Sequence, residues 1–224
     1  MKQQVKKKIP RDALLAAAIL ITLLIATTII AKLLEPNRGH STSPISLANS
    51  YKIADMSGYR NLSKTTDLFY EMEALDVVKE IDAGSTFVVV FSHEECPLCS
   101  VAIPVLNEVA SEYGWPVGYV NTRKNPEWRS NMAMDHYDEL ADHIGEYFQT
   151  DEMNRQHLYV PQIFFIQNGE VTYTYEGAGP TYDGSGNPLT PEQKNRLSEA
   201  YRKGFETKKT DLSVTQGLEN QKAG

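Results

Sequence analysis

Hydrophobic positions near the start of the chain form one uncharged run of nineteen residues, Ala13 to Ala31. A helix needs about 20 apolar residues to cross the core of a bilayer. We therefore expect a transmembrane anchor over residues 13–34. A cleaved signal peptide is the alternative, but its apolar region is usually about 7–15 residues long and precedes a small-residue cleavage site. The sequence from Ile29 to Pro36 offers no good site of that kind.

Polar segments flank this run on both sides. Residues 1–12 carry five basic groups and one acid, so the positive-inside rule keeps the N-terminus in the cytoplasm and sends the rest of the chain outside. Residues 35–60 are rich in Ser, Asn, Gly and Pro and are predicted to form a tether. A globular domain is expected over residues 61–208, and the polar residues 209–224 are predicted to be a disordered tail.

The first half of the predicted domain shows helix and strand patterns in turn. Apolar residues from Leu68 to Val78 recur at helical spacing, and Gly84 ends that predicted helix. The continuous apolar run 86–91 is typical of a strand buried on both faces. A helix is predicted to begin at Cys96 and to end near Gly114, followed by a short strand over residues 116–120.

The second half of the predicted domain begins with Asn125-Pro126, which has the chemistry of a helix start. We expect a helix over residues 126–149, then strands over 163–166 and 171–175 joined by a tight turn. Thr190 to Gln193 form a capping box that starts the last helix. These elements predict an α/β domain with a mixed sheet flanked by helices.

The overall charge argues against one class of partner. The net charge is −7, and the first twelve residues contribute +4, which leaves −11 on the other 212 residues. Because an acidic body repels phosphate backbones, we expect no nucleic-acid partner.

The chain has two cysteines, and both lie in Cys96-Pro97-Leu98-Cys99 at the predicted start of a helix. Unpaired N–H groups and the helix dipole stabilise a thiolate there, so Cys96 is expected to be the attacking nucleophile. Cys99, one turn further along, is expected to resolve the mixed disulfide. A zinc site is the alternative, but His93 and the two cysteines supply at most three of four ligands. Haem attachment would need His at position 100, which is Ser.

The residues around this motif resemble those of thioredoxins. The stretch Phe87 to Tyr113, with Pro104 five residues after the second cysteine, is similar to their active-site strand and helix. The stretch Tyr159 to Val171 is similar to their proline-bearing strand and hairpin. With its anchor, its tether and the segment 119–123, the chain looks most like the membrane-anchored thioredoxin-like proteins called bacteriocin transport accessory proteins.

This resemblance implies a thioredoxin-like fold over residues 61–208, with an additional helix before the strand that carries Pro161. It also implies that Pro161 follows a cis peptide bond and faces the two cysteines. Two positions depart from the family pattern. Glu95 replaces the usual Trp, and Val90 replaces the buried acid six residues before the first cysteine.

The absent acid raises the question of which group takes the proton of Cys99. His93, Glu94 and Glu95 are the candidates, although a solvated loop is an equally good interpretation of these three residues. The two carboxylates are also expected to oppose thiolate formation at Cys96. On the additional helix, His136 and His143 share a face and suggest a metal site, but a solvated acidic face is the favoured interpretation.

These observations predict an extracytoplasmic thiol–disulfide oxidoreductase that acts on thiol- or disulfide-containing secreted or membrane proteins. No cofactor is expected beyond the redox-active pair, which needs a redox partner to reset it. The alternative is a binding module for secretion or assembly, in which Cys96 and Cys99 form a permanent disulfide.

Overall fold

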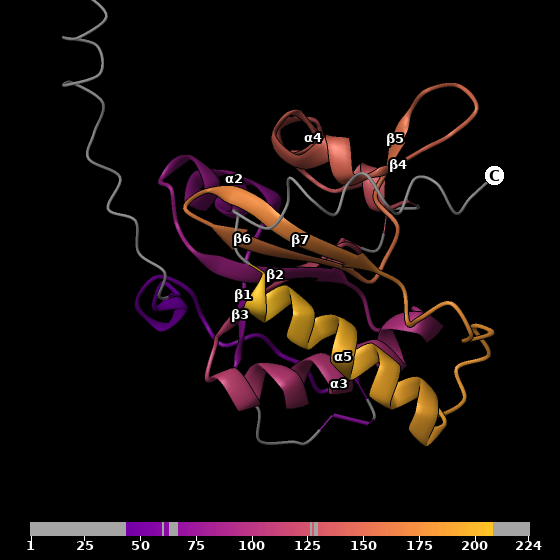
Figure 1. The fold of residues 1–224 in the computed structure, drawn as a ribbon. Coiled ribbons are helices and arrows are strands. Elements are labelled where there is room, and N and C mark those ends of the chain that lie inside the picture. Colours follow the sequence, from indigo (N-terminus) through magenta and orange to yellow (C-terminus); the bar gives the residue numbers. More distant parts are fainter. Residues whose placement is uncertain (1–43, 60, 63–66, 126, 128–129, 208–224) are drawn as a thin grey trace, which may run out of the picture. The chain divides into compact units, whose positions relative to one another are not determined.

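A computed structural model describes residues 44–59, 61–62, 67–125, 127 and 130–207 (Figure 1). The elements in chain order are η1 (Leu47–Asn49), β1 (Phe69–Glu71), α2 (Ala74–Asp82), β2 (Phe87–Ser92), α3 (Pro97–Tyr113), β3 (Val117–Asn121), η2 (Asn131–Ala133), α4 (Tyr137–Ile144), η3 (Gly145–Tyr147), β4 (Gln149–Thr150), β5 (Gln156–His157), β6 (Gln162–Gln167), β7 (Glu170–Glu176) and α5 (Pro191–Glu206).

A five-stranded mixed sheet forms the centre of the domain, in the order β1-β3-β2-β6-β7. Strands β1, β3 and β2 run parallel, β6 pairs antiparallel with β2, and β7 pairs antiparallel with β6. All six residues of the central strand β2 are buried, as predicted for a strand covered on both faces. The mixed α/β class and the thioredoxin-like fold are therefore confirmed.

Helices cover the sheet on both sides (Figure 1). Val88 and Val90 belong to a core cluster that contains residues of α3 and α5, whereas Val89 and Phe91 belong to a second cluster with residues of α2 and α4. Successive side chains of β2 thus alternate between two hydrophobic cores, as strand geometry requires. Both cysteines lie in the cluster on the α3 and α5 side.

Local capping chemistry explains why two predicted helices begin where they do. Cys96 is the N-cap of α3 and Pro97 occupies its first turn, while Gly114 ends that helix in the left-handed conformation, with φ of 65°. The side chains of Thr190 and Gln193 form the predicted capping box at the start of α5. The predicted starts of both helices are confirmed.

The helix predicted from Leu68 onward was wrong in its first part. Phe69 to Glu71 form the edge strand β1, which pairs with β3 in the register Phe69 to Val117. Helix α2 starts only at Ala74, where Glu73 and Asp76 make a capping box. The apolar spacing fits a helix, but pairing with β3 on one side and with residues 52–54 on the other supplies the backbone hydrogen bonds of this strand instead.

The additional helix before Pro161 exists but is shorter than the predicted 126–149. It covers Tyr137 to Ile144, and His136 before it adopts a left-handed φ of 59°. The Asn125 side chain accepts a hydrogen bond from the N–H of Glu127, which forms a local turn in place of a helix cap. The short hairpin of β4 and β5 that follows was not predicted.

Most of the predicted tether belongs to the domain. Leu47 and Tyr59 are almost completely buried, and Met56 lies in the same core cluster as Tyr59. Ile45 donates a backbone hydrogen bond to Thr86, and Ile53 forms a β-bridge with Tyr70. The polar composition of this stretch conceals a few apolar residues that fill both cores, so residues 44–59 are part of the folded domain.

Three predicted segments lie outside the described residues. They are the basic segment 1–12, the anchor 13–34 and the tail 209–224. Within the part of the chain that the structure describes, no helix is long and apolar enough to span a membrane.

Candidate functional site

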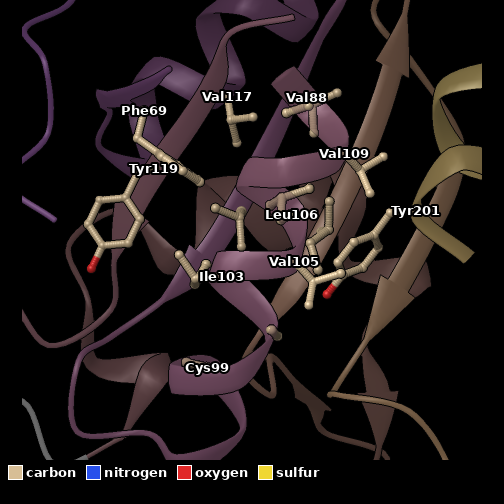
Figure 2. Packing of buried hydrophobic residues seen from close by; sticks show 14 of the residues in the cluster. Phe69, Val88, Cys99, Ile103, Val105, Leu106, Val109, Val117, Tyr119 and Tyr201 are labelled. Atoms are coloured by element: carbon tan, nitrogen blue, oxygen red, sulfur yellow. The ribbon is translucent and has the colours of Figure 1, made fainter. Parts of the chain in front are cut away.

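The two cysteines lie at the junction of β2 and α3, and both are free thiols. Cys96 caps the helix and Cys99 follows one turn later, at one end of the cluster seen in Figure 2. Cys99 is fully buried, and Cys96 is 7% exposed. Both cysteines are thus buried, because other segments pack close to the motif. One of them is the loop after β7, where a methyl group on Gly186 would touch Pro97.

Hydrogen bonds define the environment of the Cys96 sulfur. It accepts the backbone N–H of Cys99 at 3.2 Å, and its thiol donates to the carbonyl oxygen of Val160 at 3.5 Å. The Cys99 side chain and the N–H groups of Cys99 and Leu98 lower the pKa of Cys96 to about 7, against the opposing effect of burial. A substantial fraction of Cys96 is therefore thiolate near neutral pH.

The second thiol has the opposite character. Burial raises the pKa of Cys99 far above its ordinary value, and its hydrogen bond to Cys96 and the charge of Cys96 raise it further. Hydrogen bonds from the Ser92 side chain and from the His93 backbone act in the other direction. The pair therefore consists of one thiol ready to ionise and one that stays protonated.

Pro161, the third predicted site residue, lies beside this pair. Its peptide bond with Val160 is cis, and Val160 supplies the carbonyl that the Cys96 thiol contacts. The carbonyl of Pro161 accepts the N–H of Gly177 at 2.8 Å, which ties the segment to the end of β7. The structure thus brings together Cys96, Cys99 and Pro161, although Pro161 lies 65 residues after Cys96 in the sequence.

Hydroxyl groups, and not a carboxylate, lie beneath the dithiol. Val90, at the position of the family's buried acid, is completely buried in the apolar cluster that holds both cysteines. Ser92, two residues further along the same face of β2, hydrogen-bonds Cys99. The Ser92 oxygen is 2.6 Å from the hydroxyl of Tyr59, which in turn is 3.1 Å from the hydroxyl of Tyr119.

These three hydroxyl-bearing residues were not predicted from the sequence. A Ser at the end of an otherwise apolar strand was the available signal for Ser92. Tyr59 gave none, because its neighbours are polar and it was assigned to the tether. Tyr119 lies in a predicted strand, but its partners come from segments that are far away in the sequence.

The loop between β2 and α3 holds the three residues that were considered for proton handling. Burial lowers the pKa of His93, the positive charge of Arg123 lowers it further, and the negative charge of Glu95 opposes both. Glu94 and Glu95 are exposed. The hydrogen bonds described above, and not these carboxylates, are the leading causes of the shift at Cys96.

The two histidines on the additional helix bind different carboxylates. His136 is 3.1 Å from Glu139, and His143 is 3.3 Å from Asp82 on α2. Among the described residues, no group of three or more His, Cys, Asp or Glu side chains is arranged to hold a metal ion.

Comparison with known proteins gives a family match over part of the chain. Residues 64–145 match the family model described as TraF, F plasmid transfer operon protein. No curated protein matches. Among the solved structures to which the chain is similar is one described, provisionally, as an oxidoreductase with a thioredoxin fold. It is 19% identical, with a TM-score of 0.34, and the match covers 49% of this chain and 83% of that chain. The order of the strands and the dithiol at the start of α3 are those of a thioredoxin-like fold, and the family match overlaps the part of the chain that holds the dithiol.

Proposed function

We propose that the chain is a thiol–disulfide oxidoreductase that exchanges disulfides with secreted or membrane proteins through Cys96 and Cys99. The observation that carries this proposal is the inequality of the two thiols. Cys96 caps a helix, accepts N–H groups and has a pKa of about 7, whereas Cys99 is buried and stays protonated. A static disulfide would have no use for this difference in acidity.

In the proposed cycle, two successive attacks convert the dithiol to a disulfide. The Cys96 thiolate attacks a client disulfide, forms a mixed disulfide with one client sulfur and releases the other as a thiolate that takes up a proton. Cys99 then loses its proton and attacks the Cys96 sulfur. The Cys96–Cys99 disulfide forms, and the second client sulfur leaves as a thiolate. The client gains two electrons and the protein loses two, which a dithiol redox partner restores.

Catalysed exchange with a model disulfide tests this proposal. The rate of the first attack should rise with pH through about 7 and level off above it, because Cys96 is protonated below its pKa and ionised above it. The measurement is the pH dependence of single-turnover exchange by the reduced protein. An absence of exchange at any pH would contradict the proposed function.

We also propose that the domain works outside the cytoplasm, anchored by residues 13–34. The support is the nineteen-residue uncharged run behind a basic segment. Protease added to intact cells should digest the domain while an epitope at the N-terminus stays protected. A domain that survives this treatment, or a released form that starts beyond Leu34, would exclude the anchored arrangement.

A second candidate function is an accessory module that assists transfer or secretion without turnover. The observation in its favour is the description of the matching family as a plasmid transfer operon protein. Such a module would retain its role when Cys96 is replaced by Ser, whereas the oxidoreductase would lose its activity.

A further inference from the structure

A chain of buried hydroxyl groups leads away from the resolving cysteine. Ser92, Tyr59 and Tyr119 come from β2, the segment before β1, and β3, and their side chains meet in one place. Ser92 is completely buried, Tyr59 is 2% exposed and Tyr119 is 4% exposed. Three polar groups in an apolar core are costly unless each is hydrogen-bonded, and here the oxygens bond one another in sequence from Cys99 outward.

In the part of the chain that the structure describes, no carboxylate is among the groups that shift the pKa of Cys99. Cys96 on α3 acts electrostatically on Cys99. Cys99 in turn acts on Tyr59, on Tyr119 and, on α5, on Tyr201. Burial raises the pKa of all three tyrosines, so none of them serves as a charged base near neutral pH. A neutral hydroxyl still moves a proton if it accepts one from one neighbour as it donates its own to the next.

The outer end of the hydroxyl chain is close to acidic side chains. Glu94 and Asp55 both act electrostatically on Tyr119. The carboxylate of Glu94 also lies directly over Gly58, the residue before Tyr59, where even a methyl group would overlap it. Glu94 and Asp55 are exposed to solvent. The hydroxyl chain thus connects a buried thiol to a solvated acidic loop.

We propose that Ser92, Tyr59 and Tyr119 form the path by which Cys99 loses its proton when it resolves the mixed disulfide. This inference rests on the proposed function. Cys99 donates its proton to the Ser92 oxygen, Ser92 donates to Tyr59, and Tyr59 donates to Tyr119, which releases a proton toward the Glu94 and Asp55 side. The electron pair left on the Cys99 sulfur forms the bond to Cys96, and the departing client thiolate takes up a proton from water.

The three residues have different roles in this path. Ser92 bonds the reacting sulfur itself and stabilises its thiolate, so it is a catalytic residue. Tyr59 and Tyr119 hold the Ser92 oxygen in place and receive the proton, so they are positioning residues. The arrangement occupies the face of β2 where Val90 replaces the family's buried acid.

A two-phase experiment separates this path from the first attack. The full-length reduced protein is mixed with an aromatic disulfide that releases a coloured thiolate when Cys96 attacks and again when Cys99 resolves. In Ser92→Ala, the first phase should keep its rate. The second phase should slow about tenfold and its pH midpoint should rise, because a hydrogen bond to the Cys99 thiolate is lost. Tyr59→Phe should also slow the second phase and raise its pH midpoint.

Two further variants control for packing. Ser92→Thr keeps the hydroxyl and should restore most of the second-phase rate. Tyr201→Phe makes the same chemical change as Tyr59→Phe at a fully buried tyrosine whose hydroxyl has no hydrogen-bond partner among the described residues, and should leave both phases unchanged. A Ser92→Ala second phase with the wild-type rate and pH midpoint would overturn the proton path. The absence of both phases in the wild-type protein would contradict the proposed function itself.

Discussion

Replacing Cys99 by Ser is expected to trap the protein in mixed disulfides with its clients, whereas replacing Cys96 by Ser is expected to trap almost nothing. The reason is the inequality of the two thiols. Cys96 is the group that ionises near neutral pH and attacks, and Cys99 is the group that releases the client. Without Cys99, the mixed disulfide persists until an external thiol attacks it.

The effect on turnover should be among the largest of any single substitution. Cys96→Ser should lower exchange by on the order of a thousandfold or more, because a serine hydroxyl at this position does not ionise near neutral pH. Electrophoresis without reductant, followed by reduction, shows the trapped species as high-mass bands that disappear. The Cys96→Ser, Cys99→Ser double variant is the control. Equal trapping by the two single variants would mean that the thiols do not have separate roles.

Removing residues 1–60 should lower the free energy of unfolding of the domain by about 3 kcal/mol or more, whereas removing residues 1–43 should change it little. The longer deletion takes away the buried side chains of Leu47, Met56 and Tyr59, and each such side chain stabilises the fold by about 1.5–3 kcal/mol when buried. The backbone hydrogen bonds and the other buried side chains of residues 44–59 offset the entropy of ordering this segment.

Denaturant unfolding of the two shortened proteins, starting at Pro44 and at Asn61, measures this difference. The protein that starts at Asn61 should also resolve mixed disulfides more slowly, because Ser92 loses its Tyr59 partner. Equal midpoints and slopes in the two unfolding curves would show that residues 44–59 do not stabilise the domain, in conflict with their burial.

The elements that could be predicted from the sequence are those set by local chemistry. Helix α3 is fixed by Pro97 at its start and Gly114 at its end, and α5 by a capping box. The continuous apolar run of β2 is an equally local signal. In each case the residues that decide the structure lie within or next to the element.

The elements that could not be predicted depend on distant partners. Strand β1 has three residues and a helix-like apolar spacing, and it is a strand because it pairs with β3 and with residues 52–54. Residues 44–59 look like a linker by composition, and their burial follows from pockets formed by other segments.

The candidate site also has one part that could be predicted from local sequence and one part that depends on distant partners. The dithiol and Pro161 could be predicted because each lies in a short sequence motif, and the two motifs resemble those of one family in order and spacing. The hydroxyl chain is not visible, because it joins three segments between residues 59 and 119 through side-chain contacts alone. Substitution of the family's acid by Val90 indicated that another group must handle the proton, but only the fold shows which groups are near.

The reduction potential of the Cys96–Cys99 pair tests most directly the claim that this pair cycles between dithiol and disulfide. Equilibration of the protein in glutathione buffers of known potential, followed by thiol quantification, gives the value. We expect a midpoint in the range of about −270 to −120 mV that redox-active members of this superfamily cover. A potential below about −300 mV, the range of structural disulfides, would contradict cycling and support the accessory module.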